Sequence, residues 1–192
     1  LNSATWTERL RAMKIVILDR DGVINQDSDA FIKSPQEWQA IPGSLEAIAR
    51  LNHEGYRVVV ATNQSSIGRG LFDMQALNAI HHKLHNELGR YGGHLDAIFF
   101  CPHGPDEGCH CRKPAPGLFE EIARRFHCRC EGAPAIGDSL RDIQAAQAIG
   151  AQPILVRTGK GTQTLIHEPG LAQHVAVYDD LAQAVDALLG DR

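Results

Sequence analysis

Residues 15–22 read Ile15-Val16-Ile17-Leu18-Asp19-Arg20-Asp21-Gly22, and this stretch decides the fold. A short apolar run rich in β-branched residues is typical of a strand that is buried on both faces. Two acids follow it at once, and such carboxylates are costly beside a buried strand end unless a cation neutralises them. A hard divalent ion such as Mg²⁺ does so with oxygen ligands. The stretch therefore predicts a strand that ends in a magnesium site, with a solvated Asp-Gly turn as the alternative.

The same short apolar run recurs along the chain. We expect further buried strands at residues 58–61, 97–100, 133–136, 153–156 and 174–177. Amphipathic stretches of helix length lie between most of them, at residues 44–53, 73–90, 117–126, 140–149 and 180–189. This alternation predicts a three-layer α/β fold with a mostly parallel central sheet. Since no repeat or flexible linker marks a boundary, residues 13–192 are expected to form a single domain and residues 1–12 a tag or extension.

Polar residues also follow the second and fourth predicted strands and precede the helix predicted at residues 117–126. The second strand leads into Thr62-Asn63-Gln64-Ser65, the segment after the third contains Arg112-Lys113, and the fourth leads into Asp138-Ser139. In an open parallel sheet the ligand site lies beyond the carboxyl ends of the strands, where these segments meet. Each of these segments, taken alone, is also consistent with an ordinary polar loop. Together they predict one site that binds a metal ion and a phosphate group.

In this order the segments resemble the four motifs of the haloacid dehalogenase superfamily of phosphohydrolases. The resemblance spans most of the chain and rests on Asp19 to Gly22, Thr62, Lys113, and Asp138 with Asp142. It implies a Rossmann-like fold and a phosphate transfer in which Asp19 attacks phosphorus. Asp21 would protonate the leaving oxygen and later activate water.

The resemblance also implies the cofactor and the groups around the phosphate. Mg²⁺ would be held by Asp19, Asp138 and the backbone carbonyl of Asp21. Thr62, Lys113 and Arg112 would neutralise charge on the transferring group, as phosphoryl transfer demands. Asp142 is expected to orient Lys113 or a metal-bound water.

Metal ligands of another kind stand between the third strand and Lys113. They are three thiols and an imidazole, at Cys101, His103, Cys109 and Cys111. Such a set closes a tetrahedral zinc site, and a closed site is structural. His110 competes with His103, but Cys109 and Cys111 already flank His110, so we prefer His103. Zinc would then pin the loop that ends in Arg112-Lys113 and preorganise both cations. Cys128 and Cys130 are interpreted as bystanders, and His81, His82 and His85 as a solvated helix face.

A zinc loop that runs into Arg-Lys-Pro resembles two groups of this superfamily, the heptose bisphosphate phosphatases and the histidinol-phosphate phosphatases. Residues 62–70, with Arg69-Gly70 at their end, are similar to the first group. That resemblance implies hydrolysis of the C7 phosphate of D-glycero-D-manno-heptose 1,7-bisphosphate through a phosphoaspartate, which supplies heptose 1-phosphate for nucleotide-activated heptose and the lipopolysaccharide core. The histidinol-phosphate phosphatases remain the alternative.

The heptose resemblance implies a set of substrate contacts, namely Asp27, Asn63, Gln64, Ser65, Arg69, Arg112, Lys113 and Ser139. Ser139 stands where many members of that group have Lys, and we expect Arg69 and Arg112 to compensate at a distal phosphate. No large insertion follows the first or second motif, so no large cap domain is expected.

The composition limits the kinds of partner that this protein is expected to bind. The 192 residues carry 19 Lys and Arg against 23 Asp and Glu, a formal charge of -4, so no broad attraction to nucleic acid or an anionic membrane is expected. The apolar runs are too short to span a bilayer, no secretory sequence opens the chain, and clustered thiols suit a reducing compartment. We therefore expect a cytoplasmic monomer that acts on a small-molecule sugar phosphate. A noncatalytic zinc-binding interaction module is the alternative of a different class.

Overall fold

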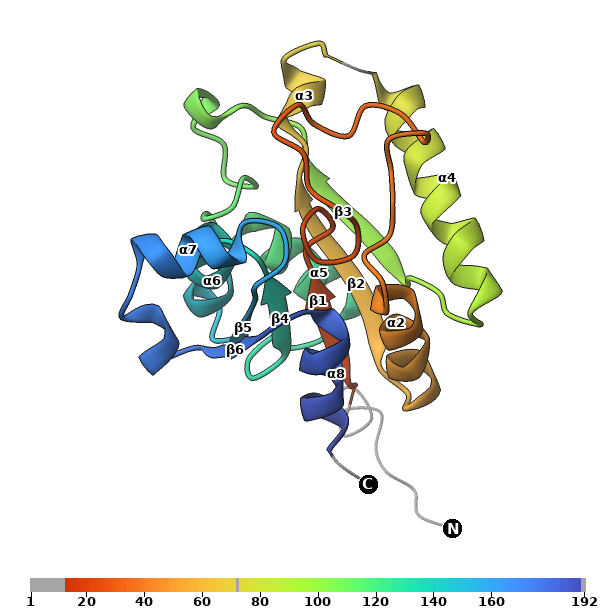
Figure 1. The fold of residues 1–192 in the computed structure, drawn as a ribbon. Coiled ribbons are helices and arrows are strands. Elements are labelled where there is room, and N and C mark those ends of the chain that lie inside the picture. Colours follow the sequence, from red (N-terminus) through yellow and green to blue (C-terminus); the bar gives the residue numbers. More distant parts are fainter. Residues whose placement is uncertain (1–12, 72, 191–192) are drawn as a thin grey trace.

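The computed structural model describes residues 13–71 and 73–190, and a six-stranded parallel sheet forms its centre (Figure 1). The predicted tag or extension at residues 1–12 lies outside the described residues. The sheet has the order β3-β2-β1-β4-β5-β6. Its strands are β1 (Ile15–Leu18), β2 (Arg57–Asn63), β3 (Ala97–Cys101), β4 (Pro134–Gly137), β5 (Gln152–Val156) and β6 (Ala176–Tyr178). All six strands overlap the predicted apolar runs, although β6 begins two residues later than predicted, and the predicted α/β fold is confirmed.

Helices cover both faces of the sheet (Figure 1). They are α2 (Ser44–His53), α3 (Ser65–Gly68), α4 (Met74–Arg90), α5 (Gly117–Phe126), α6 (Leu140–Ala148), α7 (Gly161–His167) and α8 (Leu181–Leu189), with 3₁₀ turns at η1 (Pro105–Glu107) and η2 (Leu171–Gln173). The five predicted helices are present. The short helices α3 and α7 are not predicted, because four and seven residues are too few for a helical period to show.

Alternation along the strands divides most of the core into two clusters, and a third, smaller cluster holds Ile143, Leu155 and Val175. Val16 and Leu18 of β1 pack with α2, α4 and α8, whereas Ile15 and Ile17 pack with α5 and α6 on the other face. This is the period of two that a strand buried on both faces requires. β3 and β6 depart from the prediction of buried strands, since they are the edge strands and most of their residues are only partly buried.

The strand order reverses between β1 and β4, which lie side by side at the centre of the sheet. A crevice at such a switch point is the usual ligand site of an open α/β sheet. The connections of residues 19–43 and 102–116 border this end, and neither forms a separate cap domain. Within the described part of the chain, no helix has both the length and the apolar character to cross a membrane.

Candidate active site

Asp19 is the first residue beyond β1, and its carboxylate is buried. Its Oδ1 lies 3.1 Å from Nζ of Lys113 and accepts a 2.7 Å hydrogen bond from the backbone N–H of Arg20. Burial raises the pKa of Asp19 to about 6, against the lowering effect of Lys113. Asp19 is therefore a dehydrated carboxylate with one oxygen held, which is the state expected of an attacking group.

Asp21 points to a different set of partners. Its Oδ1 accepts hydrogen bonds from Arg20 Nε (3.0 Å) and Asn25 Nδ2 (2.9 Å). Its Oδ2 accepts from Arg20 NH2 (2.8 Å) and Gln64 Nε2 (2.9 Å). Burial raises the pKa of Asp21, but the charge of Arg20 and these hydrogen bonds outweigh burial and bring it below its ordinary value. In the structure, Asp21 is thus a firmly oriented carboxylate.

Asp138 faces Asp19 from the end of β4. Its Oδ2 accepts a 2.8 Å hydrogen bond from the backbone N–H of Lys160. A Cβ added to Gly22 or Gly159 would come within 2.0 Å and 2.2 Å of that oxygen, so both positions require glycine. Burial, followed by repulsion from Asp142 and Asp19, raises the pKa of Asp138 to about 8. The fold therefore crowds this carboxylate against other acids.

Lys113 is the buried cation of the site. Its Nζ lies 2.6 Å from Oδ1 of Asp142 and donates a 2.7 Å hydrogen bond to the carbonyl of Ala61. The carboxamide of Asn63 holds the Lys113 backbone from both sides, accepting from its N–H and donating to its carbonyl, each at 3.1 Å. The expectation that Asp142 orients Lys113 agrees with this geometry. Asn63, predicted to contact substrate, uses its amide to position Lys113.

The donor set fits a magnesium ion. Carboxylate oxygens of Asp19, Asp138 and Asp142 lie within 4.8 Å of one another. The Lys113 ammonium group pairs with Asp19 and Asp142, and a single positive charge does not balance three carboxylates. A hard cation with oxygen ligands would remove the repulsion. The Asp21 carboxylate is not part of this cluster, so a role for Asp21 as a ligand through its backbone carbonyl stays a prediction.

Most of the predicted phosphate contacts line a cavity of about 220 Å³ that Asp19 and Asp138 also border, whereas Lys113 lies beneath them and does not line it. Thr62, Asn63, Gln64, Ser65, Asp27, Arg69 and Arg112 all border it. Thr62 Oγ1 accepts a 3.0 Å hydrogen bond from Gln64 Nε2, which leaves the hydroxyl proton free for a phosphate oxygen. Ser139 borders an adjoining cavity of about 790 Å³ instead, and its hydroxyl donates to Asp142.

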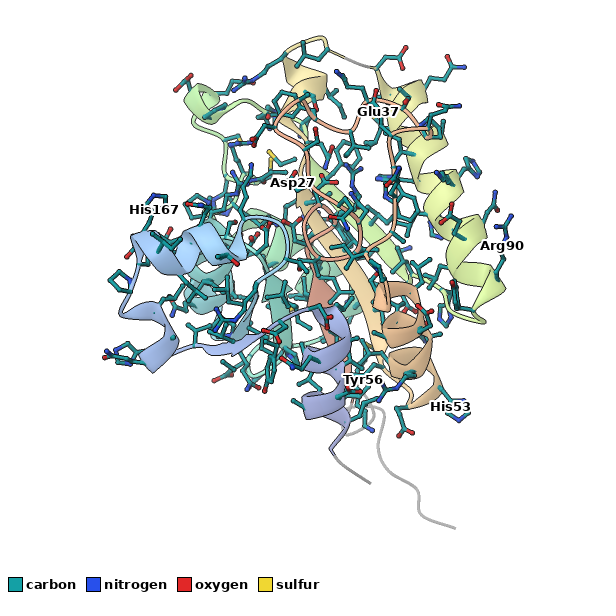
Figure 2. The ribbon with its side chains drawn as sticks, viewed as in Figure 1. Asp27, Glu37, His53, Tyr56, Arg90 and His167 are labelled. Atoms are coloured by element: carbon teal, nitrogen blue, oxygen red, sulfur yellow. The ribbon has the colours of Figure 1, made fainter. Side chains whose placement is uncertain are left out.

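Among the residues that border the cavity and that sequence reasoning missed are Phe31, Arg141 and Lys160. Arg141 and Lys160 border the adjoining cavity as well. Lys160 Nζ lies 3.3 Å from Oδ2 of Asp27, which Figure 2 shows near the carboxyl ends of the strands. Phe31 has a positive φ of 63°, which is uncommon for a bulky residue, and its ring lies 5.9 Å from the Arg69 guanidinium. No local motif marks these positions, since they reach the site only through the fold.

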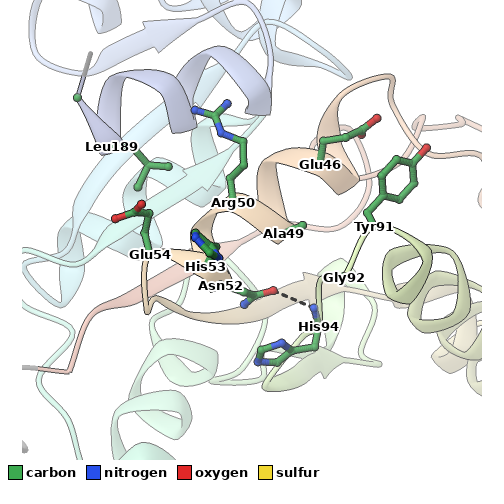
Figure 3. Close-up of a pocket in the computed structure, with 11 residues that line it drawn as sticks. Glu46, Ala49, Arg50, Asn52, His53, Glu54, Tyr91, Gly92, His94 and Leu189 are labelled. Atoms are coloured by element: carbon green, nitrogen blue, oxygen red, sulfur yellow. Dashed lines mark hydrogen bonds between the residues drawn. The ribbon is translucent and has the colours of Figure 1, made fainter. Parts of the chain in front are cut away.

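A larger cavity of about 900 Å³ lies at the other end of the molecule, near the C-terminal ends of α2, α4 and α8 (Figure 3). Residues such as His53, Tyr91 and Leu189 border it. None of the predicted site residues does so. Its position opposite the carboxyl ends of the strands separates it from the chemistry of the acids.

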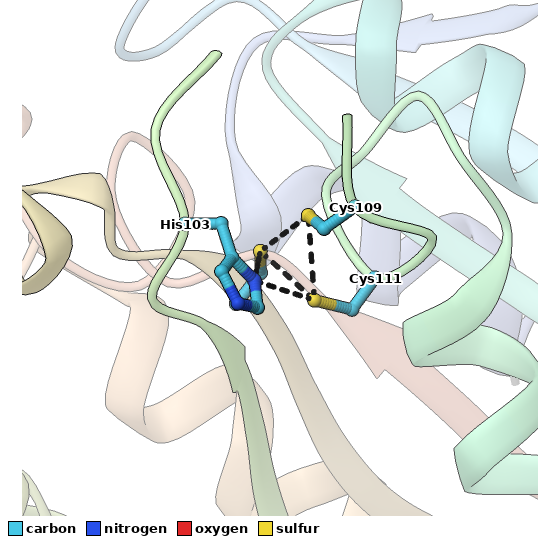
Figure 4. A group of neighbouring side chains, drawn as sticks. His103, Cys109 and Cys111 are labelled. Atoms are coloured by element: carbon cyan, nitrogen blue, oxygen red, sulfur yellow. Dashed lines mark hydrogen bonds between the residues drawn. The ribbon is translucent and has the colours of Figure 1, made fainter. Parts of the chain in front are cut away.

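The predicted zinc ligands converge (Figure 4). The Cys111 sulfur lies 3.1 Å from that of Cys101, 3.6 Å from that of Cys109 and 3.2 Å from His103 Nδ1. A tetrahedral zinc ion with Zn–S bonds of about 2.3 Å separates its ligand sulfurs by about 3.8 Å. The observed distances between the donor atoms are therefore close to those that zinc requires. His110 instead pairs with Glu120 at 2.6 Å. The structure thus favours His103.

The prediction that His81, His82 and His85 form a solvated face is wrong for His81. His82 and His85 are exposed, but His81 is partly buried and its Nε2 lies 3.3 Å from NH1 of Arg20. Burial and the charge of Arg20 lower the pKa of His81 to about 4, so its ring is neutral at physiological pH. The helical period alone does not reveal which side of α4 the β1 loop approaches.

We predict that Cys109→Ser releases zinc and weakens catalysis indirectly. The loop from Cys109 to Lys113 would lose its anchor, so kcat is expected to fall about 10- to 100-fold, by analogy with the loss of supporting groups around a metal. Metal analysis of the purified protein and a turnover assay measure both effects. Cys128→Ser, outside the cluster, is the matched control. Full activity in zinc-free Cys109→Ser would contradict a positioning role for the zinc loop.

Comparison with known proteins connects these features with a family. A family model described as HAD-hydrolase-like matches residues 110–184, and one described as polynucleotide kinase 3 phosphatase matches residues 14–138. A curated protein of Bordetella bronchiseptica named D-glycero-beta-D-manno-heptose-1,7-bisphosphate 7-phosphatase is 59% identical over 92% of this chain and 98% of that protein. This chain belongs to the heptose bisphosphate phosphatase family.

Other heptose bisphosphate phosphatases support the assignment. A Pseudomonas putida protein of the same name is 51% identical over 92% of this chain and 100% of that protein. The crystal structure of the Bordetella bronchiseptica phosphatase, which is complexed with magnesium and phosphate, superposes with a TM-score of 0.89 at 58% identity, covering 92% of this chain and 98% of that one. The family consists of phosphoric monoester hydrolases, which excludes the alternative of a noncatalytic zinc module.

Proposed function

We propose that this enzyme hydrolyses the C7 phosphate of D-glycero-β-D-manno-heptose 1,7-bisphosphate in a Mg²⁺-dependent reaction. The product, heptose 1-phosphate, would serve the synthesis of nucleotide-activated heptose and the lipopolysaccharide core. The observation that carries the chemistry is the convergence of Asp19, Asp138 and Lys113 at the switch point of the sheet. The names of the most similar relatives supply the substrate and its β anomer.

Asp19 would attack the C7 phosphorus and form a phosphoaspartate while the sugar oxygen leaves. Lys113, 3.1 Å from Asp19, and the Thr62 hydroxyl would neutralise charge on the transferring phosphoryl group. Mg²⁺, held by Asp19, Asp138 and the Asp21 backbone carbonyl, would supply further charge neutralisation when bound. Asp21 would give a proton to the leaving oxygen and later take one from the water that hydrolyses the phosphoaspartate. Because its contacts in this structure favour the ionised form, Asp21 would have to turn away from Arg20 to carry the first proton.

Three guanidinium groups at the cavity suit the second phosphate of a bisphosphate. Arg69, Arg112 and Arg141 border the cavity, and within the described residues none of them has a carboxylate within 4.0 Å. Burial and then the charge of Arg141 lower the pKa of Arg112, so these cations repel one another until an anion arrives. Arginine forks match phosphate oxygens in geometry as well as in charge. We assign the distal phosphate to this group, with Asp27, Gln64, Ser65 and Ser139 as predicted contacts.

We further propose that residues 13–192 act as a single phosphatase domain, and that the enzyme is a cytoplasmic monomer without a nucleic-acid or membrane partner. The balance of charges supports the absence of a nucleic-acid or anionic-membrane partner, because a formal charge of -4 gives no broad attraction to anionic surfaces. Gel filtration coupled to light scattering measures the oligomeric state.

The substrate is tested by phosphate release from both anomers of heptose 1,7-bisphosphate, from histidinol phosphate and from a 3′-phosphorylated oligonucleotide. We expect kcat/KM for the β anomer to exceed that for every other compound at least about tenfold, because similar relatives are named for that anomer and the guanidinium groups offer a site for its second phosphate. A preference for histidinol phosphate would move the enzyme to the histidinol-phosphate phosphatases, and a preference for the oligonucleotide would favour the activity in the description of the family model that matches residues 14–138. Activity that survives complete removal of Mg²⁺ would contradict the mechanism.

A further inference from the structure

Residues 26–39, which follow the first acidic motif, form a loop that leaves the sheet and returns to it. The backbone N–H of Gln26 donates to the carbonyl of Gln39 at 2.9 Å, so the two ends of the loop lie together. Compact loops with paired ends are frequently functional. The proposed reaction takes a substrate contact, Asp27, from this loop. What holds the loop in place therefore bears on substrate binding.

The front half of the loop borders the active-site cavity. Its lining residues are Asp27, Ser28, Asp29, Phe31 and Ile32. Asp19 and Asp138 border the same cavity, so this half faces the site of reaction. The ion pair between Asp27 and Lys160 joins two partly exposed side chains, and such pairs contribute little. The front half thus needs support from elsewhere in the fold.

The back half of the loop is held by Lys83 of α4. Lys83 Nζ donates hydrogen bonds to the backbone carbonyls of Pro35, at 2.8 Å, and Trp38, at 2.7 Å. In the part of the chain that the structure describes, neither carbonyl accepts a backbone hydrogen bond. The ammonium group also lies 5.6 Å from the centre of the Trp38 ring. Figure 2 shows Glu37, of the same half, beside α4.

This anchor lies at a firmly packed point of the loop. The Trp38 side chain is fully buried and belongs to the core cluster that contains Ile80 and Leu84 of α4. Two residues separate Ile32, at the cavity, from Pro35, at the anchor, and such a segment spans about 10 Å at most. Fixing the back half therefore limits how far the cavity wall can move.

We propose that Lys83 is a positioning residue that anchors the loop of residues 26–39 on α4, so that its front half offers a formed wall to the sugar part of the substrate. This inference rests on the proposed function, in which the substrate extends past Asp27. A wall that is ordered before binding spares the free energy of ordering it. The contacts of Lys83 among the described residues are to the loop and to α4, so its effect is on substrate binding.

The first test compares the kinetics of Lys83→Met with those of the wild type. Methionine suits a helix but cannot donate to the two carbonyls. On heptose 1,7-bisphosphate we expect KM to rise about tenfold and kcat to change less than about threefold, the pattern of lost substrate binding. On p-nitrophenyl phosphate, which carries no sugar to meet the wall, kcat/KM should change less than about twofold. Equal losses on both compounds, or an unchanged KM for the bisphosphate, would overturn the proposal.

Hydrogen exchange measures the anchor without any substrate. The amides of residues 26–39 are expected to exchange about tenfold faster in Lys83→Met, while those of α2 keep their wild-type rates. Lys33→Met, which removes an exposed cation from the same loop, is the matched control and should change neither exchange nor KM. Wild-type exchange of the loop in Lys83→Met would show that other contacts hold it, against the proposal.

Failure of the proposed substrate would be visible separately. If the wild type hydrolyses p-nitrophenyl phosphate but not heptose bisphosphate, the proposed function fails, whereas the exchange experiment still tests the anchor. The KM comparison then uses the best sugar phosphate that the wild type accepts, because any sugar at the reacting phosphate meets the same wall.

Discussion

Asp19→Asn is expected to lower kcat on heptose 1,7-bisphosphate by at least about 10⁴-fold, the largest loss of activity in this enzyme. An amide keeps the shape of the carboxylate but cannot attack phosphorus, and nucleophile replacements have effects of this order. Phosphate release and acid-quenched trapping of the phosphoenzyme measure the loss. Asp106→Asn, an exposed acid in the zinc loop, is the matched control.

The same substitution is expected to leave the fold intact. Burial raises the pKa of Asp19 to about 6 in the folded state. Near pH 7.5 this carboxylate is ionised in both states, but its ionised form is less stable in the folded state than in the unfolded chain. Replacing it by a neutral amide should raise the free energy of unfolding without Mg²⁺ by roughly 1–3 kcal/mol. Urea unfolding in EDTA checks this. Retention of more than about a hundredth of wild-type activity by a folded Asp19→Asn would show that another group is the nucleophile.

Lys113→Met is expected to have the largest effect on stability together with a severe loss of activity. Lys113 is 2% exposed and bridges Asp19 and Asp142. Its removal leaves these carboxylates without their cation, and breaking a buried pair by deleting one partner typically costs about 3–5 kcal/mol. Since Lys113 would also neutralise the transferring phosphoryl group, kcat should fall about 10³-fold.

Urea unfolding with and without Mg²⁺ measures the stability of Lys113→Met. Mg²⁺ should recover part of the lost stability, because it binds the same acids in the folded state only. The exposed Lys33→Met controls for loss of charge elsewhere. If Lys113→Met lowers the free energy of unfolding in EDTA by less than about 1 kcal/mol, the buried acids are neutral and Lys113 does not hold them ionised.

Much of the fold and of the site could be predicted because each signal is local in the chain. The apolar run of β1 needs burial on both faces wherever it lies, and Asp19 must then stand at its carboxyl end. The zinc set is local as well, since Cys101 and Cys111 are separated by one short loop. Parallel strands bring their carboxyl ends to one edge, so the convergence of Asp19, Asp138 and Lys113 follows from strand order.

Other contacts depend on which surfaces meet, and no local pattern carries that information. The same helical period would present His81 to solvent on an isolated helix, but α4 packs where the β1 loop turns and brings the ring to Arg20. Arg141 and Phe31 likewise reach the cavity through the placement of α6 and of the loop after β1. The sequence by itself determined the α/β fold, the acids and the zinc ligands, because hydrophobic period and motif spacing act within short segments. Only the tertiary structure decided that Gln64 and, through Arg20, His81 join the local partners Arg20 and Asn25 around Asp21, because Gln64 and His81 come from elements far apart in the chain.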